Sequence, residues 1–223
     1  MTSQNHHVAL VTLTDPRSPV SEAYRSLRTN LEFASLTGPL RSVVVTSPGP
    51  DEGKSTTLAN LAVTMAQAGK RTIVVDADLR RPCQHELFGL NEGPGLTNMF
   101  VDPALRERPP LQTTGVDGLW LLASGPKPPN PAELLASPQM EEIIQALNAL
   151  ADIVLFDTPP IVAVTDAAVL GTKVDGVLLV IQAGKTKRDQ AARAKTLLDQ
   201  VQARLIGTAL TNVRLDPELQ GYY

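Results

Sequence analysis

Residues 43–57 read VVVTSPGPDEGKSTT and decide the fold. The apolar β-branched run at the start of this stretch predicts a strand. The proline and glycine residues and the letters GKST then predict a phosphate-binding loop that leads into a helix. The helix is expected because Leu58, Leu61 and Met65 recur at helical spacing and Gly69 follows them. Such a loop directs backbone N–H groups and the positive end of the helix dipole at one small volume, which favours bound phosphate.

The loop departs from the usual pattern G-x-x-x-x-G-K-[ST] because Pro48 stands where a glycine is expected. The phosphate-binding residues expected from the motif are Gly49, Asp51, Glu52, Gly53, Lys54, Ser55 and Thr56. Lys54 is expected to reach the β- and γ-phosphates of a nucleotide, and Ser55 to bind the Mg²⁺ that bridges them. Asn212, at the end of the last predicted strand, is the adenine contact that its position favours, although a purely structural asparagine is equally ordinary.

The composition predicts one soluble domain. The chain has 223 residues, of which 43% are hydrophobic, and a net charge of −3. This length fits one large domain better than two, and the near balance of charge gives no reason to expect nucleic acid as a partner. No apolar run approaches the ~18 residues of a membrane span. Cys83, the one cysteine, permits no intrachain disulfide and suits a reducing cytoplasm.

Strands and helices alternate along the rest of the chain. Helices are expected at residues 19–37 and 187–203, and further strands begin near residues 71, 119, 153, 177 and 206. Because the strands are nearly continuous in apolar residues, we expect an α/β fold with a doubly wound, mostly parallel sheet covered by helices on both faces. The expected organisation is a linker, a P-loop domain and a flexible tail at residues 1–18, 19–213 and 214–223.

Two of the predicted strands run into aspartates. Residues 73–80 read IVVDADLR. In extended backbone, Asp76, Asp78 and Arg80 would point to one face. Asp157, in the run VLFDTPP, follows another strand at the edge where doubly wound sheets bind ligands. Carboxylates gathered there would be costly without a ligand, so a metal and phosphate site is the natural explanation.

These three motifs together resemble the bacterial tyrosine kinases of capsular and exopolysaccharide synthesis. The hallmark of that family is a Walker A motif, a Walker A-prime motif of the form apolar-D-x-D-x-R, and a Walker B motif of the form apolar-D-x-x-P. The segments that begin at Gly95 and Gly125 also look like family segments. The resemblance covers almost the whole chain. It implies a P-loop NTPase of the deviant Walker class, related to partitioning ATPases, with ATP and Mg²⁺ as cofactors.

The resemblance assigns a role to each charged residue of the motifs. It implies that Lys54 and Ser55 bind phosphate and Mg²⁺. It implies that Asp76 and Asp78 act on the attacking hydroxyl and on the metal, while Asp157 supports the metal through water. The chemistry agrees, because phosphoryl transfer needs positioning and charge neutralisation more than covalent help. Asp76 is the candidate base for a tyrosine hydroxyl, and support of the metal is its alternative role.

The resemblance also implies partners. Periodicity alone favours a solvated face for Glu22, Arg25 and Arg28, but their E-x-x-R-x-x-R spacing is similar to the segment with which the family assembles a homo-oligomeric ring. Tyr222 and Tyr223 are then the expected phosphoacceptors of a neighbouring subunit. The expected activator is a membrane protein that regulates polysaccharide chain length, which would hold the kinase at the inner face of the membrane. A cognate phosphatase would reset the tail.

Two other functions stay open at this point. A partitioning or division-site ATPase would hydrolyse ATP without modifying protein, but such proteins carry a second lysine early in the loop, where this chain has Gly49. That missing lysine, the Walker A-prime motif and the terminal tyrosines argue against it. A non-catalytic, ATP-binding adaptor of a polysaccharide machine is the second alternative, and an assay of tyrosine phosphorylation separates all three.

Overall fold

A seven-stranded sheet forms the centre of the computed structural model, which describes residues 10–34, 38 and 40–213. The strand order is β3-β4-β2-β5-β1-β6-β7, and all neighbours are parallel except β3 and β4. The strands are β1 (Ser42–Thr46), β2 (Thr72–Asp76), β3 (Gln112–Thr113), β4 (Leu119–Leu122), β5 (Ile153–Asp157), β6 (Gly176–Gln182) and β7 (Leu205–Thr211).

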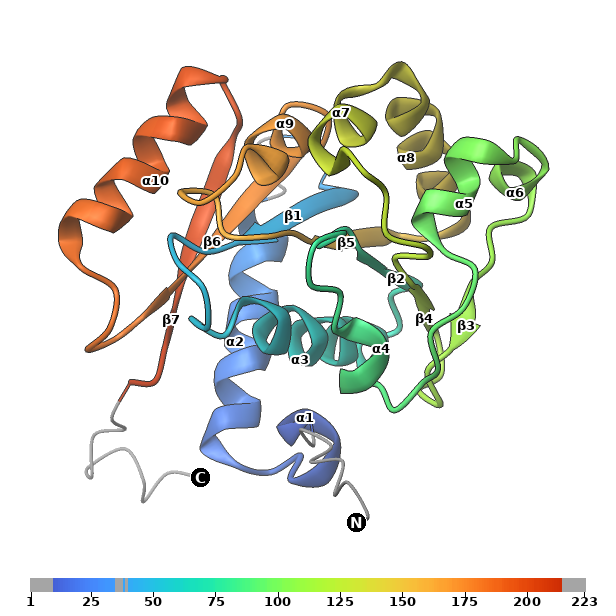
Figure 1. Ribbon diagram of the computed structural model, residues 1–223. Coiled ribbons are helices and arrows are strands. Elements are labelled where there is room, and N and C mark those ends of the chain that lie inside the picture. The colour runs from blue at the N-terminus through green and yellow to red at the C-terminus, as the bar shows by residue number, and fades with distance from the viewer. Residues whose placement is uncertain (1–9, 35–37, 39, 214–223) are drawn as a thin grey trace, which may run out of the picture.

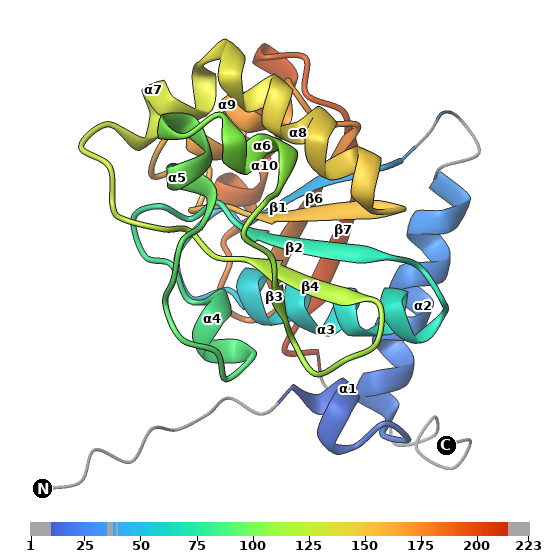
Figure 2. The ribbon, with the colours of Figure 1, turned by 90° about the vertical axis from the view of Figure 1, so that its right-hand side faces the viewer.

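Helices cover both faces of the sheet (Figures 1 and 2). One face carries α1 (Val11–Thr14), α2 (Pro19–Ala34), α3 (Lys54–Gln67) and α4 (Gln84–Leu87). The other face carries α5 (Leu96–Val101), α6 (Ala104–Glu107), α7 (Pro131–Ala136), α8 (Pro138–Leu150), α9 (Asp166–Gly171) and α10 (Arg188–Gln200). The doubly wound, mostly parallel fold predicted from the sequence is confirmed.

The sheet divides the hydrophobic core into two clusters. Val43 and Val45 of β1 join the cluster beneath α2 and α3, whereas Val44 joins the cluster beneath α8, α9 and α10. This follows from the alternation of side chains along a strand. Since both faces are covered, consecutive strand residues are all buried, which explains why the strands read as continuous apolar runs.

The sequence did not predict β3. Its two residues, Gln112 and Thr113, are polar or β-branched without any alternation that would indicate a strand. They pair antiparallel with Leu121 and Trp120 of β4, so β3 extends the sheet by one short edge strand. Of the predicted first helix, residues 19–37, the part at Pro19–Ala34 is present as α2, and residues 35–37 lie outside the described residues.

Part of the predicted linker packs on the domain. Leu10 is buried, and the backbone N–H and hydroxyl of Thr12 both donate to Asn60 Oδ1 of α3, at 3.0 and 2.8 Å. Residues 10–18 therefore belong to the folded unit, while the rest of the predicted linker and the predicted tail lie outside the described residues. Within the described part of the chain, no helix has the length and apolar character that crossing a membrane requires.

Candidate active site

The strand, loop and helix predicted around the GKST letters are present at the carboxyl edge of the sheet. β1 ends at Thr46, and α3 begins at Lys54. Gly53 caps the helix with a φ of 86°, a left-handed conformation that other residues adopt only with strain. Thr211, at the end of β7, supports the loop by donating its hydroxyl to the backbone carbonyl of Glu52 at 2.9 Å. The first amides of α3 thus face the edge where phosphate is expected.

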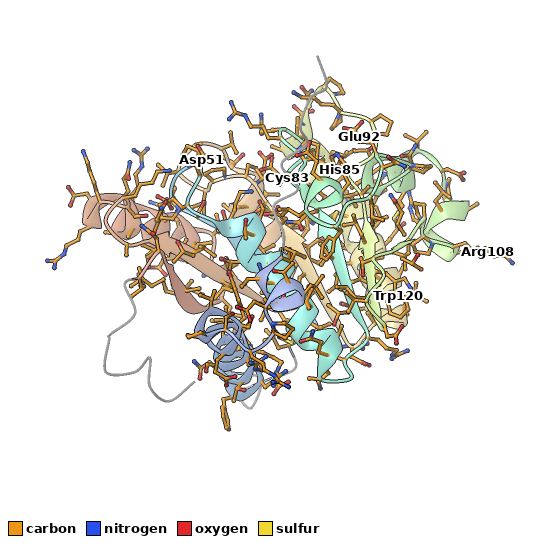
Figure 3. All side chains as sticks on the ribbon, turned by 90° about the horizontal axis from the view of Figure 1, so that it is seen from below. Asp51, Cys83, His85, Glu92, Arg108 and Trp120 are labelled. Atoms are coloured by element: carbon orange, nitrogen blue, oxygen red, sulfur yellow. The ribbon has the colours of Figure 1, made fainter. Side chains whose placement is uncertain are left out.

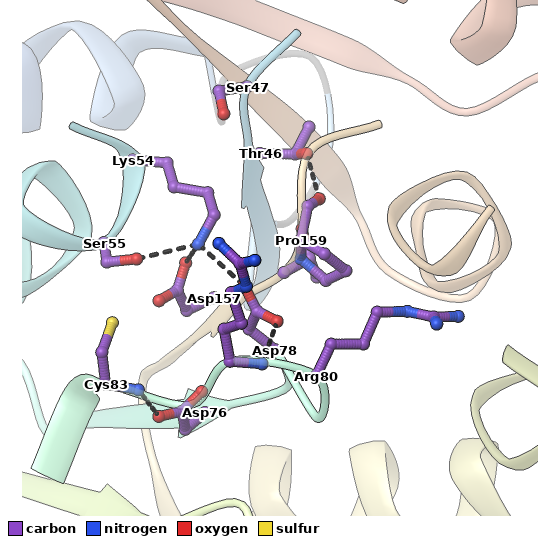
Figure 4. A network of polar contacts seen from close by, with 12 residues as sticks. Thr46, Ser47, Lys54, Ser55, Asp76, Asp78, Arg80, Cys83, Asp157 and Pro159 are labelled. Atoms are coloured by element: carbon purple, nitrogen blue, oxygen red, sulfur yellow. Dashed lines mark hydrogen bonds and ion pairs between the residues drawn. The ribbon is translucent and has the colours of Figure 1, made fainter. Parts of the chain in front are cut away.

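The Lys54 ammonium is the centre of a cluster of polar groups (Figure 4). Its Nζ donates to Ser55 Oγ at 2.9 Å. The same atom pairs with Asp78 Oδ2 at 3.1 Å and Asp157 Oδ1 at 3.2 Å. Burial lowers the pKa of Lys54, but Asp157 and Asp78 outweigh it, so the pKa lies above its usual value. The lysine, the serine and two of the three motif aspartates that the sequence assigned to one site are therefore in contact.

Asp76 lies beside this cluster in a different environment. It is opposite Asp157 in the pairing of β2 with β5, and it is fully buried. Its Oδ2 accepts the backbone N–H groups of Cys83 and Gln84, at 2.9 and 2.8 Å, while Oδ1 has no partner among the described residues. Burial, followed by the charge of Asp157, raises the pKa of Asp76 to about 8. Asp76 therefore keeps its proton to a higher pH than an ordinary aspartate does.

Gln84 is a site residue that the sequence did not indicate. Its Nε2 donates to Asp157 Oδ2 at 2.7 Å and to the carbonyl oxygen of Ser55 at 3.2 Å. It is fully buried, so it joins the phosphate-binding helix to the Walker B aspartate. A single glutamine in the four-residue helix α4 belongs to no recognisable pattern, which is why only the structure reveals it. Burial raises the pKa of the neighbouring Cys83 thiol to about 12, which disfavours the reactive thiolate.

Arg80 does not share a face with Asp76 and Asp78, so that prediction was wrong. β2 ends at Asp76, and the alternation of an extended strand does not continue to residue 80. Instead, Arg80 Nε and Nη2 form a bidentate pair with the buried Asp166, both at 2.9 Å. Because Asp166 is the first residue of α9, this pair connects the segment after β2 to the face of the sheet that carries α5 to α10.

The turn between β6 and α10 forms hydrogen bonds with the P-loop through two of its side chains. Lys185 Nζ donates to the backbone carbonyls of Pro50 and Asp51, at 3.0 and 2.8 Å. The hydroxyl of Thr186 donates to Glu52 Oε1 at 2.7 Å. The loop is thus bound to a segment more than a hundred residues further along the chain. No motif in the sequence predicted these contacts.

The other predicted nucleotide contacts differ in their surroundings. The Glu52 carboxylate is buried against Thr186, so Glu52 has only its backbone to offer a phosphate. Asn212 is exposed, and its side-chain N–H lies 3.4 Å from the carbonyl oxygen of Ala183. Its role as an adenine contact stays a prediction. The remaining predicted residues lie in the loop or in the first turn of α3: Gly49, Asp51, Gly53 and Thr56.

The predicted oligomerisation residues are on α2, away from this edge. Glu22 and Arg25 form an ion pair at 2.6 Å within the helix. Arg28 Nη1 donates to the carbonyl oxygen of Thr64 on α3, at 2.9 Å. The predicted phosphoacceptors lie outside the described residues: Tyr222 and Tyr223.

The cluster around Lys54 fits a Mg²⁺ ion in part. The Ser55 hydroxyl and the carboxylates of Asp78 and Asp157 are hard oxygen donors, and together they already hold one cation, the ammonium. No group of three or more acidic, histidine or cysteine side chains in the described ranges could hold a metal by itself. Such a site suits an ion that takes one or two carboxylates and completes its shell with water and substrate phosphates, as Mg²⁺ does.

Known proteins resemble this chain in sequence and structure. Residues 43–220 match the family described as the CobQ/CobB/MinD/ParA nucleotide binding domain. The tyrosine-protein kinase YwqD of Bacillus subtilis is 46% identical over 96% of the chain and 90% of its own length. The crystal structure of the chimerical protein CapA2B2 superimposes with a TM-score of 0.87, at 35% identity over 92% of this chain and 90% of that one.

The resemblance to division-site ATPases is more distant. The septum site-determining protein MinD of Pyrococcus horikoshii, complexed with Mg-ADP, has a TM-score of 0.63 at 18% identity, over 82% of this chain and 76% of that one. At this identity the likeness establishes the fold alone.

Proposed function

The chain belongs to the bacterial tyrosine-protein kinases, within the CobQ/CobB/MinD/ParA nucleotide-binding family, and from this premise we propose that it transfers the γ-phosphoryl group of ATP to tyrosine side chains of protein. The observation that carries the proposal is the cluster of Lys54 with Ser55, Asp78 and Asp157 at the start of α3. A cation, a hydroxyl and two carboxylates at a helix N-terminus are the groups that phosphoryl transfer needs.

Lys54 neutralises negative charge in both states of the proposed cycle. Without nucleotide, its ammonium balances the carboxylates of Asp78 and Asp157. With ATP bound, the same ammonium would donate to phosphate oxygens, and Ser55, Asp78 and Asp157 would hold Mg²⁺. The ion, when bound, neutralises charge on the phosphates. Gln84, which donates to Asp157, keeps that carboxylate in place throughout.

The transfer itself exchanges one bond for another. The tyrosine oxygen forms a bond to the γ-phosphorus, the bond from that phosphorus to the β–γ bridging oxygen breaks, and ADP leaves. The phenolic proton must pass to a base, and we assign that role to Asp76, whose Oδ1 is without a partner in the described structure. To accept this proton, Asp76 must itself be deprotonated.

The proposal also covers the acceptor tyrosines, the assembly of the kinase and its regulation. We infer that the acceptors are Tyr222 and Tyr223 of a neighbouring subunit in a homo-oligomeric ring, assembled through Glu22, Arg25 and Arg28. A membrane regulator of polysaccharide chain length would activate the kinase and keep it at the inner face of the membrane. A phosphatase would reverse the modification. Phosphorylation of the ring would then control capsule or exopolysaccharide synthesis.

An anti-phosphotyrosine blot after incubation with ATP and Mg²⁺ tests the proposal. We expect labelling of the wild type, weak without the membrane regulator, and no labelling of Lys54→Met or of the double variant Tyr222→Phe, Tyr223→Phe. ATP hydrolysis without phosphotyrosine would instead favour a partitioning-type ATPase. Nucleotide binding without either reaction would favour an adaptor.

A further inference from the structure

The Lys54 ammonium marks the oxygen atoms of the candidate site that face a cation. An ammonium carries three N–H groups. Lys54 Nζ has three oxygen atoms within hydrogen-bond distance: Ser55 Oγ, Asp78 Oδ2 and Asp157 Oδ1, at 2.9, 3.1 and 3.2 Å (Figure 4). Each of these side chains therefore turns one oxygen toward the cation, and the second oxygen of each carboxylate has a different partner.

The second oxygen of both carboxylates accepts an N–H group of the protein. Asp78 Oδ1 accepts the backbone N–H of Arg81 at 3.0 Å. Asp157 Oδ2 accepts an N–H of Gln84 Nε2 at 2.7 Å. Asp157 and Gln84 are fully buried and Asp78 nearly so, which keeps water from replacing these donors. Each carboxylate is thus held so that it offers a cation one oxygen and not two.

The two neighbours of the Gln84 amide determine its orientation. Nε2 has two N–H groups, and they donate to Asp157 Oδ2 and, at 3.2 Å, to the carbonyl oxygen of Ser55. Because both partners are acceptors, an amide turned by half a rotation would place Oε1 against two oxygen atoms. Oε1 itself is buried without a hydrogen-bond partner in the described structure, a cost that packing alone does not explain.

The main chain of Gln84 also contacts the site. Its backbone N–H donates to Asp76 Oδ2 at 2.8 Å, beside the N–H of Cys83 at 2.9 Å. Figure 3 shows Cys83 and His85, which flank Gln84 in the sequence, at the start of α4. Gln84 thus contacts all three motifs of the site. A change of its side chain leaves the contact with Asp76 in place, because that contact comes from the backbone.

We propose that Gln84 is a positioning residue that makes the metal site selective for Mg²⁺ over Ca²⁺. This role rests on the nucleotide and the Mg²⁺ of the proposed function. Mg²⁺ takes one or two carboxylates and completes an octahedral shell with water and phosphate, whereas Ca²⁺ takes about 6–8 oxygen atoms and also binds carboxylates through both oxygens. Carboxylates that each offer one oxygen meet the first requirement and not the second.

One side chain maintains this arrangement. Asp78 is held by a backbone N–H, which any residue except proline supplies at position 81. Asp157, in contrast, is held by the side chain of Gln84. Without that side chain, both oxygens of Asp157 become available to a cation.

Gln84 also limits the size of the site. It joins the Ser55 carbonyl at the start of α3 to the Asp157 carboxylate at the end of β5, so it restricts how far these two residues can separate. Ca²⁺ needs a wider site than Mg²⁺, because its bonds to oxygen are about 0.3–0.5 Å longer. A site of fixed width therefore favours the smaller ion.

Calorimetric titration of the chain with ADP tests the proposal without phosphoryl transfer. Kd is measured in saturating Mg²⁺, in saturating Ca²⁺ and in EDTA, and the value in EDTA is the reference for binding without metal. We expect the wild type to bind ADP roughly tenfold more tightly with Mg²⁺ than with Ca²⁺. Gln84→Met keeps the length of the side chain and removes its donors, so this ratio should fall to about twofold or less. Gln190→Met, the same change on the exposed surface of α10, should keep the ratio of the wild type.

The ratio separates positioning from general damage to the fold. A purely structural loss would weaken binding with both ions alike and leave the ratio unchanged. Gln84→Asn, whose shorter amide cannot reach both partners, is a second variant in which the ratio should fall, and it replaces Gln84→Met if that variant does not fold. A wild type that binds ADP equally well with both ions would overturn the proposal, and so would an unchanged ratio in the folded variants.

The outcome is independent of the tyrosine kinase assay, because the titration contains ADP and needs no tyrosine. Selectivity that depends on Gln84, in a chain that forms no phosphotyrosine, would support the role of Gln84 and reject the kinase function. Phosphotyrosine formed by a chain without such selectivity would support the kinase function and reject the role of Gln84.

Discussion

At the scale of single residues, Lys54 matters to stability as well as to transfer. Its ammonium is the cation that balances Asp78 and Asp157, both buried. Lys54→Met should therefore lower the free energy of unfolding by about 3–5 kcal/mol in nucleotide-free protein, because removal of one partner leaves buried charge uncompensated. Urea denaturation measures this loss, with Lys54→Arg as the control that keeps the charge. A Met variant as stable as wild type would contradict the assigned pairing.

Asp76 should make stability depend on pH. Its pKa is about 8 in the folded protein, against 3.8 for an ordinary aspartate. Between these values the folded chain keeps a proton that the unfolded chain has lost, so the free energy of unfolding falls as pH rises, by at most about 1.4 kcal/mol per pH unit. Asp76→Asn should flatten this dependence between pH 5 and 8 in metal-free protein. Asp152→Asn is the control, because the Arg71 hydrogen bond lowers the pKa of Asp152 to about 2, outside this window. Equal slopes for wild type and Asp76→Asn would refute the prediction.

At the scale of elements, the turn between β6 and α10 should position the P-loop. Lys185 donates hydrogen bonds from this turn to two carbonyls of the P-loop. Because its side chain is exposed, we expect these bonds to stabilise the shape of the loop that binds ATP by about 1 kcal/mol. Lys185→Ala should accordingly raise KM for ATP roughly fivefold with a smaller effect on kcat, and Lys185→Arg should restore it. Lys187→Ala, two residues away, is the matched control. An unchanged KM for Lys185→Ala would show that the loop keeps its shape without the turn.

The elements also show what a sequence can predict. The P-loop, α3 and the strands that end in Asp76 and Asp157 were predicted because their signals are local: apolar runs, glycines and spacing within a dozen residues. Gln84 and Lys185 were not, because each acts through a contact with a distant segment. Arg80 was misplaced for a related reason. A strand pattern predicts the direction of a side chain only while the strand continues, and β2 ends at Asp76, four residues before Arg80.

At the scale of the whole molecule, the order of the strands places the residues of the candidate site along one edge of the sheet. The P-loop follows β1, Asp157 ends β5, and Asp76 ends β2. These three strands lie in the order β1-β5-β2, so the P-loop and the two carboxylates follow one another along a single edge. Parallel strands produce this arrangement because their carboxyl ends meet on the same side.

The structure divides the predicted ring contacts of α2 into two kinds. Glu22 and Arg25 pair with each other and stay 40% and 31% exposed, and Arg25 Nη2 also donates to the exposed carbonyl of Pro16. Both side chains can therefore exchange these exposed contacts for an ion pair across an interface. Arg28 contacts its own subunit instead, since its Nη1 donates to the backbone carbonyl of Thr64. Its Nε is also buried, without a hydrogen-bond partner in the described structure.

Arg25→Ala should therefore convert a ring into monomers without loss of stability, because repeated identical interfaces lose one ion pair each. Arg28→Ala should instead lower the free energy of unfolding by about 1–3 kcal/mol, since it removes the hydrogen bond between the Arg28 guanidinium and the Thr64 carbonyl. Light scattering with ATP and Mg²⁺, at low and high salt, measures the first effect, and urea denaturation the second. Arg193→Ala, an exposed arginine on α10, is the control for both. A wild type that stays monomeric in every condition would exclude the ring, and equal stability losses for Arg25→Ala and Arg28→Ala would refute the division between them.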